Sequence, residues 1–153
     1  MQSVSAYDMK LSQISLPQIR FNIPSIDHVV GSIRFGGITE ISGEAGCGKS
    51  QICLFLALKC SLNIEFGGVN GSTAYLNCGE GEFPVRRLSQ MANAMSEKIN
   101  NEASSGIITD NNTDTIATPI LPAALMEKVF IERIDNFEQL LESVVSDSLV
   151  LFS

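Results

Sequence analysis

Eight consecutive residues of this 153-residue chain have the types and spacing needed to bind phosphate. They match the pattern G-x-x-x-x-G-K-[ST], in which glycines let backbone N–H groups turn toward a polyphosphate. Lys49 would reach the β and γ phosphates, and the Ser50 hydroxyl would ligate Mg²⁺. The eight residues are Gly43, Glu44, Ala45, Gly46, Cys47, Gly48, Lys49 and Ser50. The motif therefore predicts binding of a nucleoside triphosphate with Mg²⁺.

This motif is informative only between a strand and a helix. Residues 38–41 are rich in β-branched side chains and follow two glycines, which predicts the strand. Residues 51–59 are good helix formers and apolar on nearly every side, so we expect a helix that is buried against a sheet. The competing interpretation is a glycine-rich turn without a ligand, and the correct flanks count against it.

Two carboxylates follow the next predicted strand, which covers residues 73–77. Glu80 and Glu82 would lie at the carboxyl end of that strand, where α/β sheets hold their ligands. A carboxylate there could orient and deprotonate a water that attacks the γ-phosphate. Both residues are also ordinary candidates for a solvated turn, because most exposed acids have no catalytic role.

The segments before the motif are less regular. Residues 1–22 are polar and weakly periodic, which is typical of an arm or linker. Ser25 or Asp27 could cap a short helix through residues 28–30. The single histidine, His28, has no companions at metal-ligand spacing and is interpreted as structural.

The segments after residue 83 continue an α/β pattern. Pro84 can open a helix that runs to about Ile99. Residues 100–122 are rich in Asn, Ser, Thr, Asp and Pro, which predicts a mobile surface insertion. A third strand is expected around residues 129–131, and apolar residues at helical spacing follow over 137–145. Asp135 and Asn136 are candidates to cap that helix.

Composition excludes several function classes. The net charge of −7 argues against a strongly basic nucleic-acid surface on this chain. No apolar run reaches the ~18 residues needed to span a bilayer, so no membrane partner is expected. The four cysteines form no C-x-x-C pair, which suits an intracellular reducing compartment.

A nucleotidase of this type also needs an aspartate at the end of an apolar strand to hold Mg²⁺ through its water shell. No apolar strand after residue 83 ends in such an aspartate. Asp135 follows residues 129–134, but Glu132 and Arg133 interrupt that apolar run. We therefore expect either an incomplete metal site or a chain truncated before this Walker B strand.

At this point the residues carry a resemblance. Residues 37–44, the phosphate loop and Gln51 directly after Ser50 resemble the core of the eukaryotic RecA-type recombinases and their paralogues. Residues 75–88 resemble that family's second strand and the segment after it. The form of residues 83–88, with 129–132 and 140–142, is most similar to the subfamily of the X-ray repair cross-complementing paralogue numbered three. The resemblance covers roughly residues 23–153.

The resemblance implies a P-loop NTPase fold of α/β class, a RecA-like three-layer core with a mainly parallel sheet, incomplete at its C-terminal side. It implies a partial ATP-binding core over residues 23–153. The nucleotide site would comprise residues 43–50, Gln51, and Arg87 near the adenine. Glu80 best matches the catalytic glutamate, but this chain has one extra residue before it, so Glu82 stays open. The family's DNA-binding loops would lie beyond residue 153.

Three functions compete. The first is an ATP-binding recombinase paralogue in homologous-recombination DNA repair, a DNA-dependent ATPase or ATP-dependent damage sensor at full length. It would work with other paralogues or a recombinase, in the nucleus, with the cytoplasm as a second location. The second is a nucleotide-stabilised assembly module without turnover, which the missing aspartate favours for these 153 residues. The third, an unrelated P-loop kinase, fits Gln51 and the segment around Glu80 less well.

Overall fold

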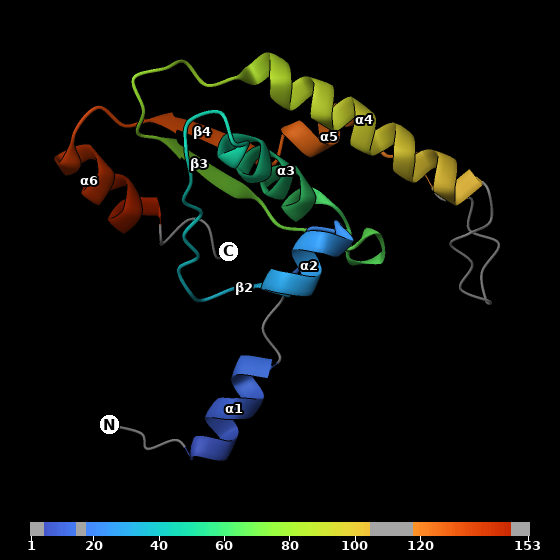
Figure 1. Cartoon of the computed structure of the whole chain (residues 1–153), viewed down its shortest axis with the longest axis horizontal. Helices are drawn as coiled ribbons and strands as arrows, with labels where there is room; N and C mark the ends of the chain where they lie inside the picture. Colours follow the sequence, from blue (N-terminus) through green and yellow to red (C-terminus); the bar gives the residue numbers. More distant parts are fainter. Residues whose placement is uncertain (1–4, 15–17, 105–117, 148–153) are drawn as a thin grey trace. The chain divides into compact units, whose positions relative to one another are not determined.

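The computed structural model describes residues 5–14, 18–104 and 118–147. Figure 1 shows the helices and strands coloured along the sequence, most of them labelled. By their contacts the described residues fall into two units, and the chain passes from one to the other between Lys49 and Ser50. The first unit carries most of the phosphate-loop motif, and the second carries an α/β layer structure.

The first unit contains two helices and a two-stranded sheet. Helix α1 (Ala6–Ile14) lies within the predicted arm, where weak periodicity gave no indication of a helix. Strands β1 (Gln18–Ile19) and β2 (Ile33–Arg34) pair antiparallel, and α2 (Pro24–Val30) connects them. Ile19 and Phe21 are buried, so this small sheet has an apolar interior.

The predicted cap of α2 is wrong. The helix begins one turn earlier than expected, at Pro24, and its N-cap residue Ile23 makes no side-chain cap hydrogen bond. Proline suits the first helical position because its ring fixes φ and its missing N–H needs no partner there. The Asp27 carboxylate instead accepts a hydrogen bond of 2.8 Å from the Phe21 N–H, which ties the end of the β1 segment to the helix.

The predicted strand over residues 38–41 is also wrong. These residues have no regular secondary structure, and Ile38 is fully exposed. The two sheets formed by the described residues are β1–β2 and β3–β4, so residues 38–41 have no neighbouring strand there. A strand needs a partner because its N–H and C=O groups must be hydrogen-bonded, and propensity alone does not supply one.

The second unit confirms the predicted helices after the loop, after Pro84 and over residues 137–145, and the strands at residues 73–77 and around 129–131. Two short helices, which the sequence did not predict, also occur there. Helix α3 (Lys49–Ser61) follows the loop, and a short 3₁₀ helix, η1 (Ile64–Phe66), leads toward β3 (Thr73–Asn77). Helix α4 (Val85–Ser104) begins directly after Pro84. The last three elements are α5 (Pro122–Met126), β4 (Val129–Arg133) and α6 (Phe137–Asp147).

Strands β3 and β4 pair in parallel and lie between helices. Side chains alternate between the two faces of a sheet. On one face, the Thr73 hydroxyl donates to the Ala57 carbonyl of α3 over 3.3 Å. On the other face, the Glu132 carboxylate accepts a hydrogen bond of 2.8 Å from Ser143 of α6. Helices α3 and α6 therefore contact opposite faces of the sheet, as the helix layers of an α/β protein do.

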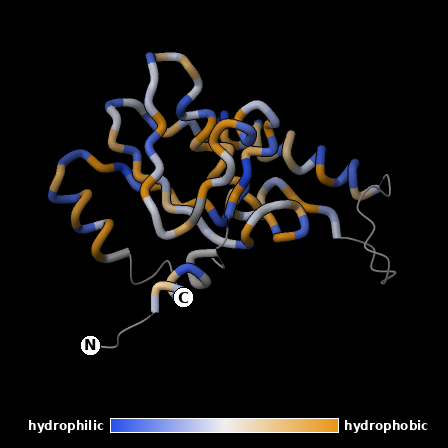
Figure 2. The backbone as a smooth tube through the Cα atoms, turned by 60° about the horizontal axis from the view of Figure 1, so that its bottom comes forward, coloured by the Kyte–Doolittle hydropathy of each residue, from blue (hydrophilic) through white to orange (hydrophobic). Residues whose placement is uncertain are grey.

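The core of the second unit lies between α3, α4, α5 and the sheet. Figure 2 shows hydrophobic and hydrophilic positions interspersed along the backbone of the described residues. Gly68 approaches this core closely, since a Cβ there would lie 2.1 Å from the Leu62 carbonyl oxygen. The buried residues of the core are Leu54, Ala57, Leu58, Leu62, Leu88, Ala92, Ile99, Leu125 and Val129.

The two ends of the predicted insertion are tied together. Helix α4 extends to Ser104, beyond the expected end at Ile99. The Asn100 amide donates to the Ile120 carbonyl over 3.0 Å and accepts from the Ile120 N–H over 2.9 Å. Residues 105–117 of the insertion lie outside the described residues, so its mobility stays a prediction. Over the described ranges, no helix is long and apolar enough to cross a membrane.

Candidate nucleotide site

The phosphate-loop motif forms a tight turn whose glycines have distinct roles. Gly46 and Gly48 have φ angles of 80° and 96°, a region that side chains disfavour. A Cβ at Gly43 would lie 2.8 Å from the Cys47 sulfur, so Gly43 is needed for close approach instead. The sequence predicted turn roles for Gly43 and Gly48 but missed the conformational requirement at Gly46.

Lys49 is held over the first turn of this loop. Its Nζ donates to the carbonyl oxygens of Gly43 and Glu44, over 2.8 and 2.7 Å. The Cys47 sulfur lies 3.8 Å from the same nitrogen. These contacts place a positive charge at the loop, and the first N–H groups of α3 lack helical partners. Both features favour the binding of an anion at the loop.

The start of α3 is joined to α4 through two predicted site residues. Gln51 follows the exposed Ser50, and its Oε1 accepts a hydrogen bond of 2.6 Å from Arg87 Nε. Arg87 NH1 also donates to Gln90 over 3.3 Å. The guanidinium group is therefore fixed by two neutral amides rather than by a carboxylate. The second unit thus brings Gln51 and Arg87 into contact. Their place in a nucleotide site stays a prediction.

The two candidate carboxylates lie on one exposed turn, residues 78–83, after β3. Glu80 and Glu82 flank Gly81, whose carbonyl accepts a hydrogen bond of 2.8 Å from the Asn77 side-chain amide. At the end of the turn, the Phe83 ring meets Tyr75 edge-on, with centroids 4.9 Å apart. Both ends of the turn are thereby attached to β3.

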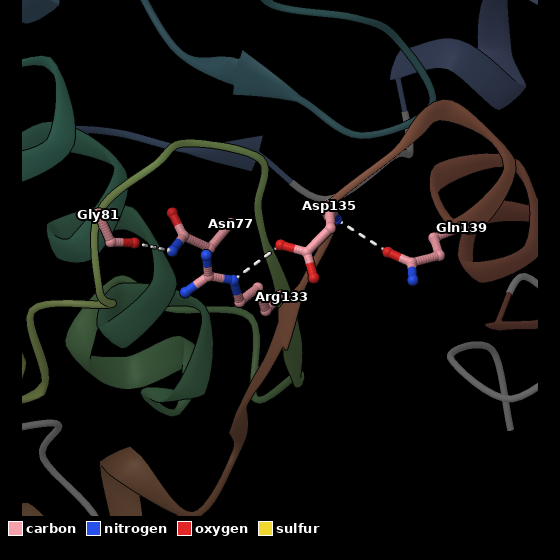
Figure 3. Close-up of polar contacts among 5 residues, drawn as sticks. All are labelled: Asn77, Gly81, Arg133, Asp135 and Gln139. Carbon is pink, nitrogen blue, oxygen red and sulfur yellow. Dashed lines mark hydrogen bonds and ion pairs between the residues drawn. The ribbon is translucent and has the colours of Figure 1, made fainter.

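Sequence reasoning missed a polar cluster beside this turn. Arg133 Nε donates to Asp135 Oδ1 over 2.8 Å, and the Asp135 N–H donates to Gln139 Oε1 over 2.8 Å. Figure 3 shows Arg133 and Asp135 near Asn77 at the ends of β3 and β4. The sequence does show polar residues at the ends of both strands. It does not show that β3 and β4 are neighbours, and these polar residues meet only because the two strands pair.

The predicted cap of α6 is confirmed for Asn136. Its Oδ1 accepts a hydrogen bond of 2.9 Å from the Gln139 N–H, three residues into the helix. Gln139 reaches back to the preceding backbone, in the manner of a capping box. Asp135 has a different role from the predicted one, because its carboxylate pairs with Arg133.

The described residues offer no preformed metal centre. Among residues 5–14, 18–104 and 118–147, no three His, Cys, Asp or Glu side chains gather closely enough to hold a metal. Mg²⁺ bound with a nucleotide does not require such a cluster, because phosphate oxygens and water supply most of its ligands. The motif predicts the Ser50 hydroxyl as a protein ligand of that Mg²⁺.

A family model described as Rad51 matches residues 16–115, a segment that includes the loop, α3, β3 and α4. The chain is 46% identical over 67 residues to a DNA repair protein XRCC3 homolog from Arabidopsis thaliana. That match covers 44% of this chain and 22% of the relative.

Two further relatives extend the match. A DNA repair protein RAD51 homolog from Solanum lycopersicum is 37% identical over 89 residues, covering 58% of this chain and 26% of the relative. A DNA repair and recombination protein RadA from Halobacterium salinarum is 29% identical over 118 residues, covering 76% of this chain and 34% of the relative. In each case the match spans about a third or less of the relative's length.

Proposed function

Because the chain belongs to the Rad51 family, we propose that it binds ATP with Mg²⁺ through residues 43–50 as a recombinase paralogue of homologous-recombination DNA repair. The observation that carries the proposal is the glycine turn that holds the Lys49 ammonium over the loop beside the start of α3. A triphosphate would exchange the two carbonyl contacts of Lys49 for phosphate oxygens. Ser50 would ligate the Mg²⁺ that accompanies the nucleotide.

Loss of the Lys49 charge tests this proposal. We expect Lys49→Ala to lower MgATP affinity by about 10- to 100-fold, because a charged hydrogen bond contributes about 1.5–3 kcal/mol. Equilibrium titration with a fluorescent ATP analogue measures the change. Lys98→Ala is the matched control, since Lys98 forms only an exposed i,i+4 pair with Glu102. Equal affinity in Lys49→Ala and the parent would refute binding at the loop.

Hydrolysis is a separate proposal from binding. In the first candidate function Glu80, or Glu82, activates the attacking water, and the full-length protein is a DNA-dependent ATPase. In the second, nucleotide stabilises an assembly module without turnover, which is favoured by the engagement of Asp135 with Arg133. A phosphate-release assay with DNA, on a longer form and on its Glu80→Gln variant, separates them. Release that Glu80→Gln abolishes supports the ATPase, and no release from the longer form supports the module.

Family membership removes the unrelated P-loop kinase from consideration. The partners we propose are other recombinase paralogues or a recombinase, together with DNA at full length. Nuclear action is proposed on the same basis, since the relatives are named as DNA repair proteins. The net charge of −7 is unfavourable for DNA binding by these 153 residues alone. Co-purification of a longer form with a recombinase tests the partner proposal.

A further inference from the structure

Asn70 and Gly71 form the one Asn-Gly pair of the sequence, and they lie in the loop between η1 and β3. Glycine has no side chain, so the Gly71 nitrogen can approach the side-chain carbon of the preceding asparagine without hindrance. A Cβ at Gly71 would find its nearest atom 3.5 Å away, on Val69, so the loop does not need glycine there for space. The pair is therefore open to reaction as it stands, and the loop accommodates alanine at position 71.

The Asn70 side chain is held by Lys128, which directly precedes β4. Lys128 Nζ donates to Asn70 Oδ1 over 2.8 Å and to the Ser61 carbonyl at the end of α3 over 3.5 Å. An ammonium at this distance polarises the amide carbonyl. It would also stabilise the negative charge that develops on Oδ1 when a nucleophile adds to Cγ. Lys128 is thus placed as a stabiliser of the tetrahedral intermediate of acyl transfer.

Two backbone hydrogen bonds hold the same loop against the end of α3. The Asn70 N–H donates to the Leu62 carbonyl over 2.7 Å, and the Gly71 N–H donates to the Cys60 carbonyl over 2.9 Å. Asn70 is exposed and has a φ of 52°, a left-handed conformation that asparagine tolerates better than most residues. The Gly71 nitrogen must leave Cys60 before it can react, so local opening of the loop controls its reaction.

We propose that Asn70 is a self-modification site, at which the Gly71 nitrogen attacks Asn70 Cγ while Lys128 stabilises Oδ1, so that the side-chain amide becomes a carboxylate. The new N–Cγ bond closes a five-membered imide. Solvent water takes the Gly71 proton, and Asn70 Nδ2 leaves as ammonia. Water then adds to one of the two imide carbonyls and breaks its bond to nitrogen, which gives aspartate or isoaspartate at position 70. No redox step occurs, and water is the co-reactant.

The two products differ in what they do to the loop. Aspartate at position 70 keeps the backbone, tolerates the left-handed conformation as asparagine does, and places a carboxylate beside Lys128. Isoaspartate adds one carbon to the backbone before Gly71, so the hydrogen bonds to Leu62 and Cys60 lose their spacing. The isoaspartate form therefore frees the loop from α3, whereas the aspartate form retains it. Conversion is thus a slow and irreversible change to the connection between α3 and β3.

Peptide mass mapping of the folded full chain, aged at neutral pH and body temperature, tests the proposal. We expect an amide-to-acid mass gain at Asn70. Asn63, which is exposed in the same connection but is followed by the branched Ile64, should stay largely unchanged. Gly71→Ala should lose most of the conversion. Lys128→Gln should lower the rate about 3- to 10-fold, the smaller part of what a hydrogen bond from a charged group contributes when water screens it. Lys128→Arg should restore the rate, because it keeps the charge and the donor.

Two controls separate a role of Lys128 in the reaction from a role in holding the loop. Hydrogen exchange of the Gly71 amide gives the opened fraction of each variant. The conversion rate divided by this fraction should still fall in Lys128→Gln. In concentrated guanidinium chloride the parent and Lys128→Gln should convert equally fast, because the two side chains meet only in the folded chain. No conversion at Asn70, conversion of Asn63 at the same rate, or an undiminished rate per opened molecule in Lys128→Gln would overturn the proposal.

Discussion

Arg86 and Arg87 are neighbours in sequence, and the structure shows side-chain hydrogen bonds for Arg87. Both are exposed in the first turn of α4, and Arg87 donates to Gln51 and Gln90. Neither partner is charged, so the Arg87 guanidinium keeps its full charge for another ligand. Arginine planes stack on aromatic rings, and adenine offers such a ring. The hydrogen bonds of Arg87 to Gln51 and Gln90 therefore distinguish it from Arg86, although the sequence gives no reason to prefer one arginine.

A base-dependent loss of affinity is expected for Arg87→Ala. Stacking contributes about 0.5–2 kcal/mol, so MgATP affinity should fall by about 2- to 30-fold. Binding of inorganic tripolyphosphate, which lacks the base, should not change. Arg86→Ala serves as control and should affect neither ligand. Titration of both ligands against the three proteins measures this, and a parallel loss for tripolyphosphate would instead assign Arg87 to phosphate.

Local residue features were predictable from sequence, and non-local ones were not. The loop lysine, the Asn136 cap and the glutamates of the turn all depend on spacing along the chain. The pairing of Asn77 with Arg133 depends on strand order, because these residues lie far apart in sequence and meet only when β3 and β4 pair in parallel. Hydrophobic periodicity predicts strands but not their neighbours.

The same distinction holds for whole elements. Residues 73–77 and 129–133 form strands because each provides the other's ladder partners, with helices on both faces. Residues 38–41 have comparable propensity and form none among the described elements. Helix α3 was predictable because its hydrogen bonds are internal, and its buried residues Leu54, Ala57 and Leu58 match the expected apolar character.

The side chains of Asn100 and Ser96 fasten helix α4 to the segment before α5. Asn100 makes both an accepting and a donating hydrogen bond to Ile120, and the Ser96 hydroxyl donates to the same carbonyl. These groups are partly or fully buried, so an unpaired one would be costly. The two ends of the predicted insertion are thus joined by the hydrogen bonds between Asn100 and Ile120.

Removal of that amide should destabilise the second unit. We expect Asn100→Ala to lower the free energy of unfolding by about 1–3 kcal/mol, because the Ile120 N–H loses its partner. Asn93→Ala, on the exposed face of α4, isolates the gain in helix propensity that alanine brings. Urea unfolding followed by far-UV circular dichroism measures both variants. If Asn100→Ala and Asn93→Ala changed the free energy of unfolding equally, water would replace the Asn100 hydrogen bonds without loss of stability.

At the scale of the whole molecule, weak acids that folding shields from water make stability depend on pH. Two partly buried weak acids of the second unit, Cys60 and Tyr75, have raised pKa values. Burial raises the pKa of the Cys60 thiol above its ordinary value of 9.0, with a smaller opposing effect from the hydrogen bond to Thr73. Burial likewise raises the pKa of Tyr75 above 10.0, with a further contribution from Cys53.

The free energy of unfolding should therefore fall as the pH rises above about 9. Between the unfolded and folded pKa values, the unfolded chain has released a proton that the folded chain retains, so rising pH favours unfolding. The stabilisation is complete below about pH 9 and is lost as pH rises through the raised Cys60 value, with a slope below ~1.4 kcal/mol per pH unit. Urea midpoints measured at about pH 8, 9 and 10 should fall over the last interval. Cys60→Ala should flatten that fall, whereas Cys78→Ala, which removes an exposed thiol, should not. An unchanged slope in Cys60→Ala would assign the alkaline loss to other groups.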